Sequence, residues 1–276
     1  MADFPLYDGS VFEAIGVDLT DSKGTLLTAG GTAHTKGSWV QLSASAPEGI
    51  TGFFVQFYNP DYASADSRIS VDIGIGSPET VIVPDLRHLT RVGFGGNTYF
   101  IPLHIPGGVS VSARMQAGTG ISRTMDVALG VYRGCFLSSS PMTQATHYGF
   151  NSASTTGTAV DPGAAANTKG AAAEITASCT NPIRSMMILI GNGTVGNPPT
   201  RYSTSGYLVD IGIGATPDYI LTNIPLVARG IDDCIWPAVI GPFDCCIPAG
   251  TRIVARAQSN ETGSERAFDL SIIGFN

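Results

Sequence analysis

The hexapeptide VDIGIG occupies residues 71–76 and occurs again, letter for letter, at residues 209–214. Its apolar residues alternate with Asp and Gly, a period of two that predicts a half-buried β-strand. The apolar side chains should face a core, whereas Asp72, its counterpart Asp210 and the glycines face outward. Glycine at such a place lets another backbone or side chain come close. Each aspartate is alone on its strand, so the strand by itself suggests a scaffold element used twice.

The similarity extends from the hexapeptide in both directions. Residues 24–57 align without a gap on residues 157–190, with 10 of 34 positions identical, including a Thr-Lys-Gly sequence in each copy. Further along, IPGGVSVSARMQ at 105–116 matches IPAGTRIVARAQ at 247–258. A repeat this long corresponds to a whole domain rather than to the unit of a solenoid. The repeat therefore indicates a tandem duplication of one domain.

The repeat boundaries predict the domain organisation of the 276 residues. We expect an N-terminal arm (1–23), a first domain (24–137), a linker rich in Ser and Thr (138–156) and a second domain (157–276). Each predicted domain falls within the common size range of independently folding units.

The period of two recurs in most apolar segments, and 34 Gly and 17 Pro interrupt the chain at short intervals. This pattern predicts an all-β protein made of two tandem antiparallel β-sandwich domains of jelly-roll type. An immunoglobulin-like sandwich is the alternative, but the Cys…Trp…Cys pattern of that fold is missing. We expect a helical turn within each of the segments 80–89 and 218–228.

Composition excludes several classes of partner. Charged residues make up only 13% of the chain, the formal net charge is −7, and no basic run is present. Nucleic acid and anionic membranes are therefore poor partners. No apolar run is long enough to span a membrane, and the first ten residues lack the features of a secretory signal, so we expect a soluble protein made in a cytoplasm.

Five cysteines are too few and odd in number for a disulfide framework. We expect them to be reduced and mostly buried. Cys245 and Cys246 are neighbours, so they should point to opposite faces of a strand.

No catalytic, cofactor or metal site is predicted. The four histidines (His34, His88, His104 and His147) lie in no recognisable catalytic frame, and we expect surface or satisfied loop residues. The acidic pairs Asp61/Asp66 and Asp232/Asp233 lack the alternating oxygen spacing of a calcium loop. The repeated Thr-Lys-Gly lacks the frame of a phosphate-binding loop, so a tight turn explains it better.

Two groups of residues are candidates for binding. Aromatic residues in predicted loops could form a platform on which sugar rings stack: Tyr58, Tyr62, Tyr99, Phe100, Tyr202, Tyr207 and Trp236. The predicted arm is too apolar to be purely solvated, and its candidate assembly contacts are Phe4, Leu6, Tyr7 and Phe12. The arm could dock on a neighbouring subunit or the other domain. Alternatively, it folds onto its own domain.

The segments HTKGSWVQLSAS, VDIGIG, IPLHIPGGVSVSARMQ and FDCCIPAGTRIVARAQS resemble structural proteins of tailed bacteriophage virions. This resemblance covers the chain from about Gly24 onward. It implies a non-enzymatic component assembled in the bacterial cytoplasm into the virion, where it contacts other virion proteins and forms a homo-oligomer. Capsid decoration, a collar or neck fibre, and a tail-fibre or baseplate adaptor all remain open. The alternative is a carbohydrate- or receptor-binding module exposed on the virion surface.

Overall fold

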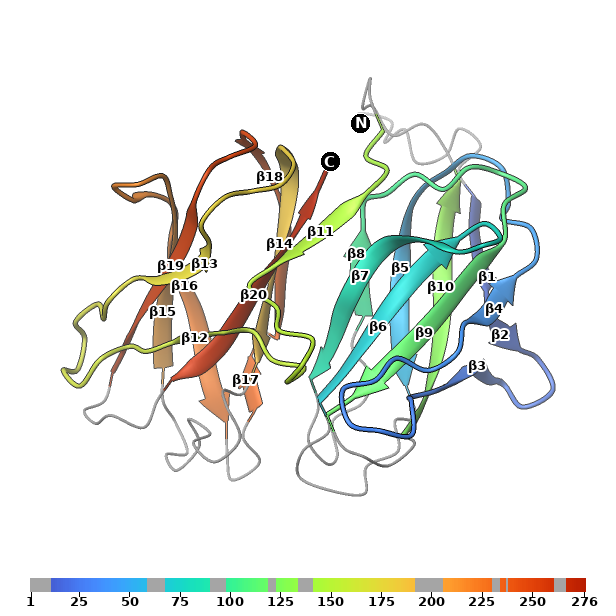
Figure 1. Ribbon diagram of the computed structural model, residues 1–276, viewed down its shortest axis with the longest axis horizontal. Helices are drawn as coiled ribbons and strands as arrows, with labels where there is room; N and C mark the ends of the chain where they lie inside the picture. Colours follow the sequence, from blue (N-terminus) through green and yellow to red (C-terminus); the bar gives the residue numbers. More distant parts are fainter. Residues whose placement is uncertain are drawn as a thin grey trace, which may run out of the picture.

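The structure is a computed structural model that describes residues 11–58, 68–89, 98–118, 123–133, 141–191, 206–229, 234–236, 238–260 and 267–276. Two β-sandwiches lie side by side, each made of two antiparallel sheets (Figure 1). Strands account for all the regular secondary structure in these residues. The described part of the chain therefore holds no helix that could cross a membrane.

The first domain has two sheets, which we call the outer and the inner sheet. The outer sheet comprises β1 (Val11–Ile15), β2 (Val17–Asp18), β3 (Lys23–Thr28), β5 (Ile50–Tyr58), β8 (Thr98–Ile101) and β10 (Thr124–Arg133). The inner sheet comprises β4 (Val40–Ser43), β6 (Arg68–Ile75), β7 (Thr80–Leu89) and β9 (Val111–Ala117). The strand orders are β2-β3-β10-β5-β8, with β1 also on β10, and β4-β9-β6-β7.

The second domain repeats both sheets. Its outer sheet comprises β11 (Ala145–Tyr148), β12 (Thr158–Val160), β14 (Ile183–Gly191), β18 (Val239–Ile247) and β20 (Phe268–Phe275). Its inner sheet comprises β13 (Ala173–Thr176), β15 (Gly206–Ile213), β16 (Asp218–Arg229), β17 (Cys234–Trp236) and β19 (Ile253–Ser259). The orders β11-β20-β14-β18 and β13-β19-β15-β16 match those of the first domain, and β17 adds an edge strand.

The connections between strands define the fold type. In the first domain β4 lies in the inner sheet, β5 in the outer sheet, β6 and β7 in the inner sheet, and β8, β9 and β10 alternate again. This arrangement, with four main strands in each of two facing sheets, is that of a jelly roll. The prediction of two duplicated jelly-roll-like sandwiches is therefore confirmed, and the immunoglobulin-like alternative is excluded.

Each sandwich has its own core. In β5 the side chains of Phe53, Val55 and Phe57 are at most 1% exposed and point between the sheets. A separate cluster in the second domain includes Ile188, Ile211 and Phe268. Burying a side chain of this size contributes about 1.5–3 kcal/mol to folding, so alternation along the strands is the main determinant of the fold.

The predicted domain boundaries at residues 24 and 157 are displaced in the structure. Strand β1 pairs with β10 through Ile15↔Leu129, and β11 pairs with β20 through Tyr148↔Ile272. Ile15 and Tyr148 complete the two cores, where they are 8% and 5% exposed. From residue 11 onward the predicted arm therefore belongs to its own domain, and part of the predicted linker belongs to the second domain.

The expected helical turns are also absent, because segments 80–89 and 218–228 lie in strands β7 and β16. Both strands carry register shifts against their partners. Asp85 and Asn223 take the same left-handed conformation at matching places, with φ of 52° and 55°. Such an irregularity interrupts the period of two, which explains why these strands did not read as strands.

Candidate interaction surfaces

The aspartate of each VDIGIG sequence is the centre of a cluster of opposite charges. Nζ of Lys36 lies 2.8 Å from Oδ1 of Asp72, and Nε of Arg114 lies 2.8 Å from Oδ2. The backbone amide of Asp85 also donates to Oδ1 at 2.8 Å. Asp72 points away from the core as predicted, yet its side chain is only 4% exposed because these groups cover it.

The second domain repeats this cluster. Lys169 and Arg256 donate to the two carboxylate oxygens of Asp210 at 2.7 and 2.9 Å, and the amide of Asn223 donates at 2.8 Å. Burial alone would raise the pKa of Asp210, but the bonds from Lys169, Asn223 and Arg256 together lower it below its usual 3.8. A carboxylate held ionised and saturated in this way ties strands together and is not available as a general acid.

Aromatic rings cover both arginines and require the glycines of VDIGIG. The Arg114 guanidinium lies 4.4 Å from the centre of the Trp39 ring, and that of Arg256 lies 3.7 Å from the Tyr219 ring. A Cβ on Gly74 would come within 2.8 Å of the Trp39 ring. The expected close approach of another side chain over the glycine is therefore confirmed.

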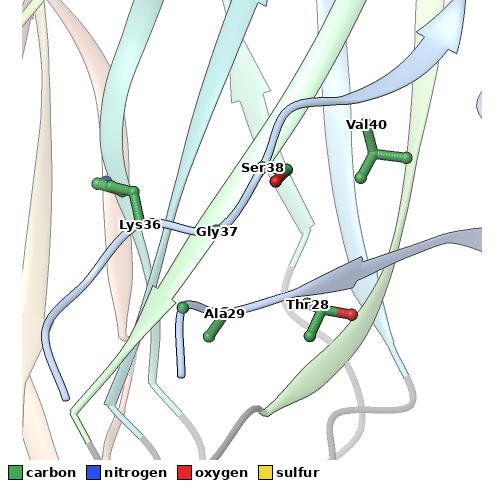
Figure 2. Close-up of a pocket in the computed structure, with 7 residues that line it drawn as sticks. Thr28, Ala29, Lys36, Gly37, Ser38 and Val40 are labelled. Carbon is green, nitrogen blue, oxygen red and sulfur yellow. The ribbon is translucent and has the colours of Figure 1, made fainter. Parts of the chain in front are cut away.

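The repeated Thr-Lys-Gly segment supplies the lysine of this cluster. Its glycine allows a backbone crossing, because a Cβ on Gly37 would lie 2.0 Å from the carbonyl oxygen of Thr28. An open hollow of about 530 Å³ lies beside this crossing. Figure 2 shows the side chain of Lys36 directed away from Thr28 and Val40. Its Nζ donates to Oδ1 of Asp72 at 2.8 Å. The lining thus offers hydroxyl groups but no available charge.

The four histidines all make contacts within the fold. His88 is fully buried against the ring of Phe57, and burial lowers its pKa to about 4. The expectation of a surface or loop residue was wrong for His88, because it faces inward from β7. Nδ1 of His34 is hydrogen-bonded to Oγ1 of Thr155, and Nδ1 of His104 is hydrogen-bonded to the Ile50 carbonyl oxygen.

His147 lies where the two domains meet. Its Nε2 is 2.8 Å from Oγ of Ser271, and its ring stacks on Phe150. Burial, followed by the positive charges of Arg87 and Lys36, lowers its pKa to about 3. A hollow of about 400 Å³ beside it is lined from both domains, with Pro84 and Asp85 of β7 on one side. A neutral imidazole here fits an interface better than a catalytic site.

The domain interface is apolar and contains a fully buried ion pair. Side chains on the outer face of the second domain's outer sheet join the core cluster of the first domain: Ala145, Met187, Leu189, Ile273 and Phe275. Arg87 of β7 forms an ion pair with Asp269 of β20, and each side chain is 1% exposed. The two sandwiches therefore share a continuous apolar contact.

The corresponding face of the first domain carries a row of aromatic side chains. Ring centres are 5.3 Å apart for Phe12 and Tyr132, 5.7 Å for Tyr132 and Phe54, and 5.0 Å for Phe54 and Phe100. The row crosses strands β1, β10, β5 and β8, on the side away from the core. Phe12 is 56% exposed. We call these four residues the aromatic row.

The predicted binding residues have different positions. Phe12 lies in the aromatic row, whereas Phe4, Leu6 and Tyr7 lie outside the described residues. Tyr58 ends β5, half-buried, with its pKa raised by burial and by Asp126. Tyr207 is wrong as a ligand-facing residue, because it is 2% exposed and packs edge-on against Phe268 in the second core. Trp236 ends the edge strand β17, but its side chain is not among those described, and Tyr62 and Tyr202 lie outside the described residues.

Sequence reasoning singled out Phe100 but missed Phe54 and Tyr132. It also singled out Tyr99, which is only 1% exposed in the core of the first domain. A signal was available, because strict alternation through β5 places Phe54 on the opposite side from Phe53 and Val55. The cysteines agree in part with expectation: Cys179 is buried, Cys245 is half-buried and Cys246 is exposed, all as free thiols. Within the described residues no group of His, Cys, Asp or Glu could hold a metal ion.

Neither a family model nor a curated protein sequence matches the chain. Among solved structures, PNGF-II in its P21 crystal form has a TM-score of 0.39 and 10% identity, over 96% of this chain. This chain spans 65% of the length of PNGF-II. The CBM22-1–CBM22-2 tandem domain of Paenibacillus barcinonensis Xyn10C has a TM-score of 0.29 and 8% identity, over 97% of this chain and 92% of its own.

The tandem CBM51 modules of Sp3GH98, the family 98 glycoside hydrolase from Streptococcus pneumoniae SP3-BS71, have a TM-score of 0.26 and 9% identity. The match covers 97% of this chain and 100% of the tandem CBM51 modules. Similarity at this level does not bear on function. The sheets and sites above define the class: a tandem jelly-roll protein whose two repeated aspartates are each bound by a lysine and an arginine of their own domain.

Proposed function

We propose that the protein is a non-enzymatic structural subunit that works by binding other proteins, and that its place is a tailed-phage particle. The observation that carries the first part is the aromatic row. The row lies on the outer face of the first domain's outer sheet. In the second domain the equivalent face is buried against the first domain.

The second domain illustrates what this face can bind. Met187, Leu189 and Phe275 are fully buried there in the cluster of the first domain. Large aromatic and aliphatic side chains in desolvated contacts contribute most of the energy of protein interfaces. An equivalent face rich in aromatic rings is suited to a partner of the same kind.

The charged groups support a non-enzymatic role. Asp72 and Asp210 each accept bonds from a lysine and an arginine, and Arg87 is paired with Asp269. Catalytic groups need access to substrate. Within the described residues the carboxylates of these clusters are at most 4% exposed, because their partners cover them. The place in a phage particle rests on the sequence resemblance alone.

A second candidate function, binding of carbohydrate or of a glycan receptor, rests on the same row. Aromatic rings at a sheet surface can stack on sugar rings, and Phe12 is largely exposed. Hydrogen-bonding groups beside the rings would be needed for specificity, and Gln56 of β5 is exposed next to Phe54.

The two candidates are separated by one pair of variants. We expect Tyr132→Ser to abolish incorporation of the chain into purified particles, measured by quantitative mass spectrometry, and to leave a glycan array blank. The control is Gln41→Ser, an exposed change on the inner sheet. The carbohydrate-binding hypothesis predicts a different result: the unmodified chain binds selected glycans, Tyr132→Ser loses that binding, and incorporation into particles is unaffected.

A further inference from the structure

The contact between the two domains joins two distinct surfaces. The second domain contributes the outer face of its outer sheet, through Ala145, Met187 and Phe275. The first domain contributes the outer side of its inner sheet around β7, where Ile82 is 4% exposed and belongs to the same cluster. We call these the docking face and the receiving face. Because the chain is a duplication, each domain has both.

The docking face of the first domain corresponds to that of the second by strand register. Phe12 pairs with Tyr132 as Ala145 pairs with Phe275, because Ile15↔Leu129 matches Tyr148↔Ile272. Likewise Phe54 lies opposite Gly130 as Met187 lies opposite Ile273. Met187 and Phe275 are fully buried, whereas Phe12 is 56% exposed.

A turn beside the docking face repeats in the same way. Turn 151–156 of the second domain is bonded to the first domain. Nε2 of Gln116, in β9 of the first domain, donates to the Ser152 carbonyl and to Oγ1 of Thr155, both at 2.9 Å. In the first domain the same turn is 18–23, since Asp18↔Lys23 matches Asn151↔Thr156. Ser22 and Thr155 share the unusual φ of 54°.

At the place of Ser152 this turn carries Leu19, which is 86% exposed. Leu19 also borders an open hollow of about 680 Å³, together with Val17 and Leu26, which are 40% and 50% exposed. Three exposed apolar side chains on one hairpin extend the apolar surface of the aromatic row.

The receiving face of the second domain is exposed, as is the docking face of the first domain. Register places Ile220 of β16 where β7 has Ile82, since Ile211↔Leu221 matches Ile73↔Val83. Ile220 is 37% exposed against 4% for Ile82. Gln258, the counterpart of Gln116, is only half-buried on the neighbouring strand β19, whereas Gln116 is 1% exposed.

We infer that the docking face of the first domain binds the receiving face of the second domain of another copy, in the geometry that joins the two domains within a chain. This inference rests on the proposed structural role. Such a contact is heterologous, so successive copies add head to tail and form a ring if the rotation closes or a filament if it does not.

The contact between chains is weaker than the contact within one. Pro225 stands at the place of Arg87, since Leu208↔Pro225 matches Ser70↔Arg87, so the buried ion pair with Asp269 is not repeated. Exposed Gln56 also replaces the fully buried Leu189. Association therefore depends on concentration.

The test uses two variants of the full chain that each remove one face, Leu19→Asp and Ile220→Asp. Sedimentation velocity of the unmodified chain should show oligomers that grow with concentration, and each variant alone should stay monomeric. A mixture of the two should form one-to-one dimers and nothing larger, because one intact docking face then meets one intact receiving face. Gln41→Asp, on the inner sheet of the first domain, is the control and should assemble like the unmodified chain.

Three results would overturn the inference. An unmodified chain that is monomeric at every concentration excludes the contact. A mixture without dimers shows that the two faces do not meet each other. Association that appears only after residues 1–10 are deleted shows that the chain's own first residues cover the docking face. Either of the first two results could occur while the chain is still incorporated into particles. Failure of this contact is therefore distinguishable from failure of the proposed function.

Discussion

Arg87 of the first domain and Asp269 of the second form an ion pair in which each side chain is 1% exposed. The pair lies within the apolar contact that joins the sandwiches and has no counterpart elsewhere in the duplication, since Pro225 occupies the place equivalent to Arg87. It is therefore specific to the contact inside the chain.

Removing one partner of this pair should be strongly destabilising. Arg87→Met leaves Asp269 buried beside no cation, and the expected loss in the free energy of unfolding is about 3–5 kcal/mol. Urea denaturation followed by circular dichroism measures it. The control is Arg133→Met, which breaks the exposed pair with Glu13 (3.1 Å) and should cost about 0–1 kcal/mol. Equal, small losses in both variants would contradict a buried pair.

The duplicated aspartates should have matching effects on stability. Asp72→Asn and Asp210→Asn each weaken the bonds from a lysine and an arginine, with an expected loss of about 1–3 kcal/mol. Asp21→Asn, which affects the exposed pair with Lys23, is the control and should change little. The pKa of Asp210 is lowered when folded, so its contribution is present above the unfolded pKa of 3.8 and is lost as pH falls through the lowered value. A large loss in only one domain would show that the two clusters are not equivalent.

His88 should make the protein less stable in mild acid. Its pKa falls from 6.5 to about 4 on folding, so between these values the unfolded chain binds a proton that the folded chain does not. Stability should therefore decrease by roughly 3 kcal/mol from pH 6.5 to pH 4, at about 1.36 kcal/mol per pKa unit. His88→Leu, which copies Leu226 at the matching place of β16, should remove this part of the slope. An unchanged pH profile of unfolding in His88→Leu would refute the assignment.

Gly74 should be required by the Trp39 ring. Gly74→Ala places a methyl group 2.8 Å from the ring, so the Trp39–Arg114 stack must shift, at a cost of about 1–3 kcal/mol. Near-ultraviolet circular dichroism and tryptophan fluorescence should both change. Gly31→Ala, where a Cβ would meet nothing within 4 Å, is the control. Identical spectra for Gly74→Ala and the unmodified chain would show that the ring does not lie there.

Sequence alone was sufficient for the duplicated jelly roll, because its determinants are local. Alternation in segments such as Phe53–Phe57 sets which side of each strand is buried, and the repeated VDIGIG aligns the halves. The boundaries at 24 and 157 were misplaced since β1 and β11 have diverged in sequence while keeping the same pairing. Pairing across a sheet depends on residues far apart in the chain.

The sites were less predictable for the same reason. Asp72 was correctly placed outward, but its partners Lys36 and Arg114 come from other segments, 36 and 42 residues away. Tyr207 was assigned to a loop, although it begins the inward-facing pattern of β15. The aromatic row assembles from four strands, so no single stretch of sequence reveals it.

Electron cryomicroscopy of a particle that contains this chain would show directly whether the aromatic row is a protein-binding surface. We expect density for two adjacent jelly rolls, with protein packed on the face formed by Phe12, Phe54 and Tyr132. A particle in which that face is open to solvent, or covered by a sugar chain, would contradict it.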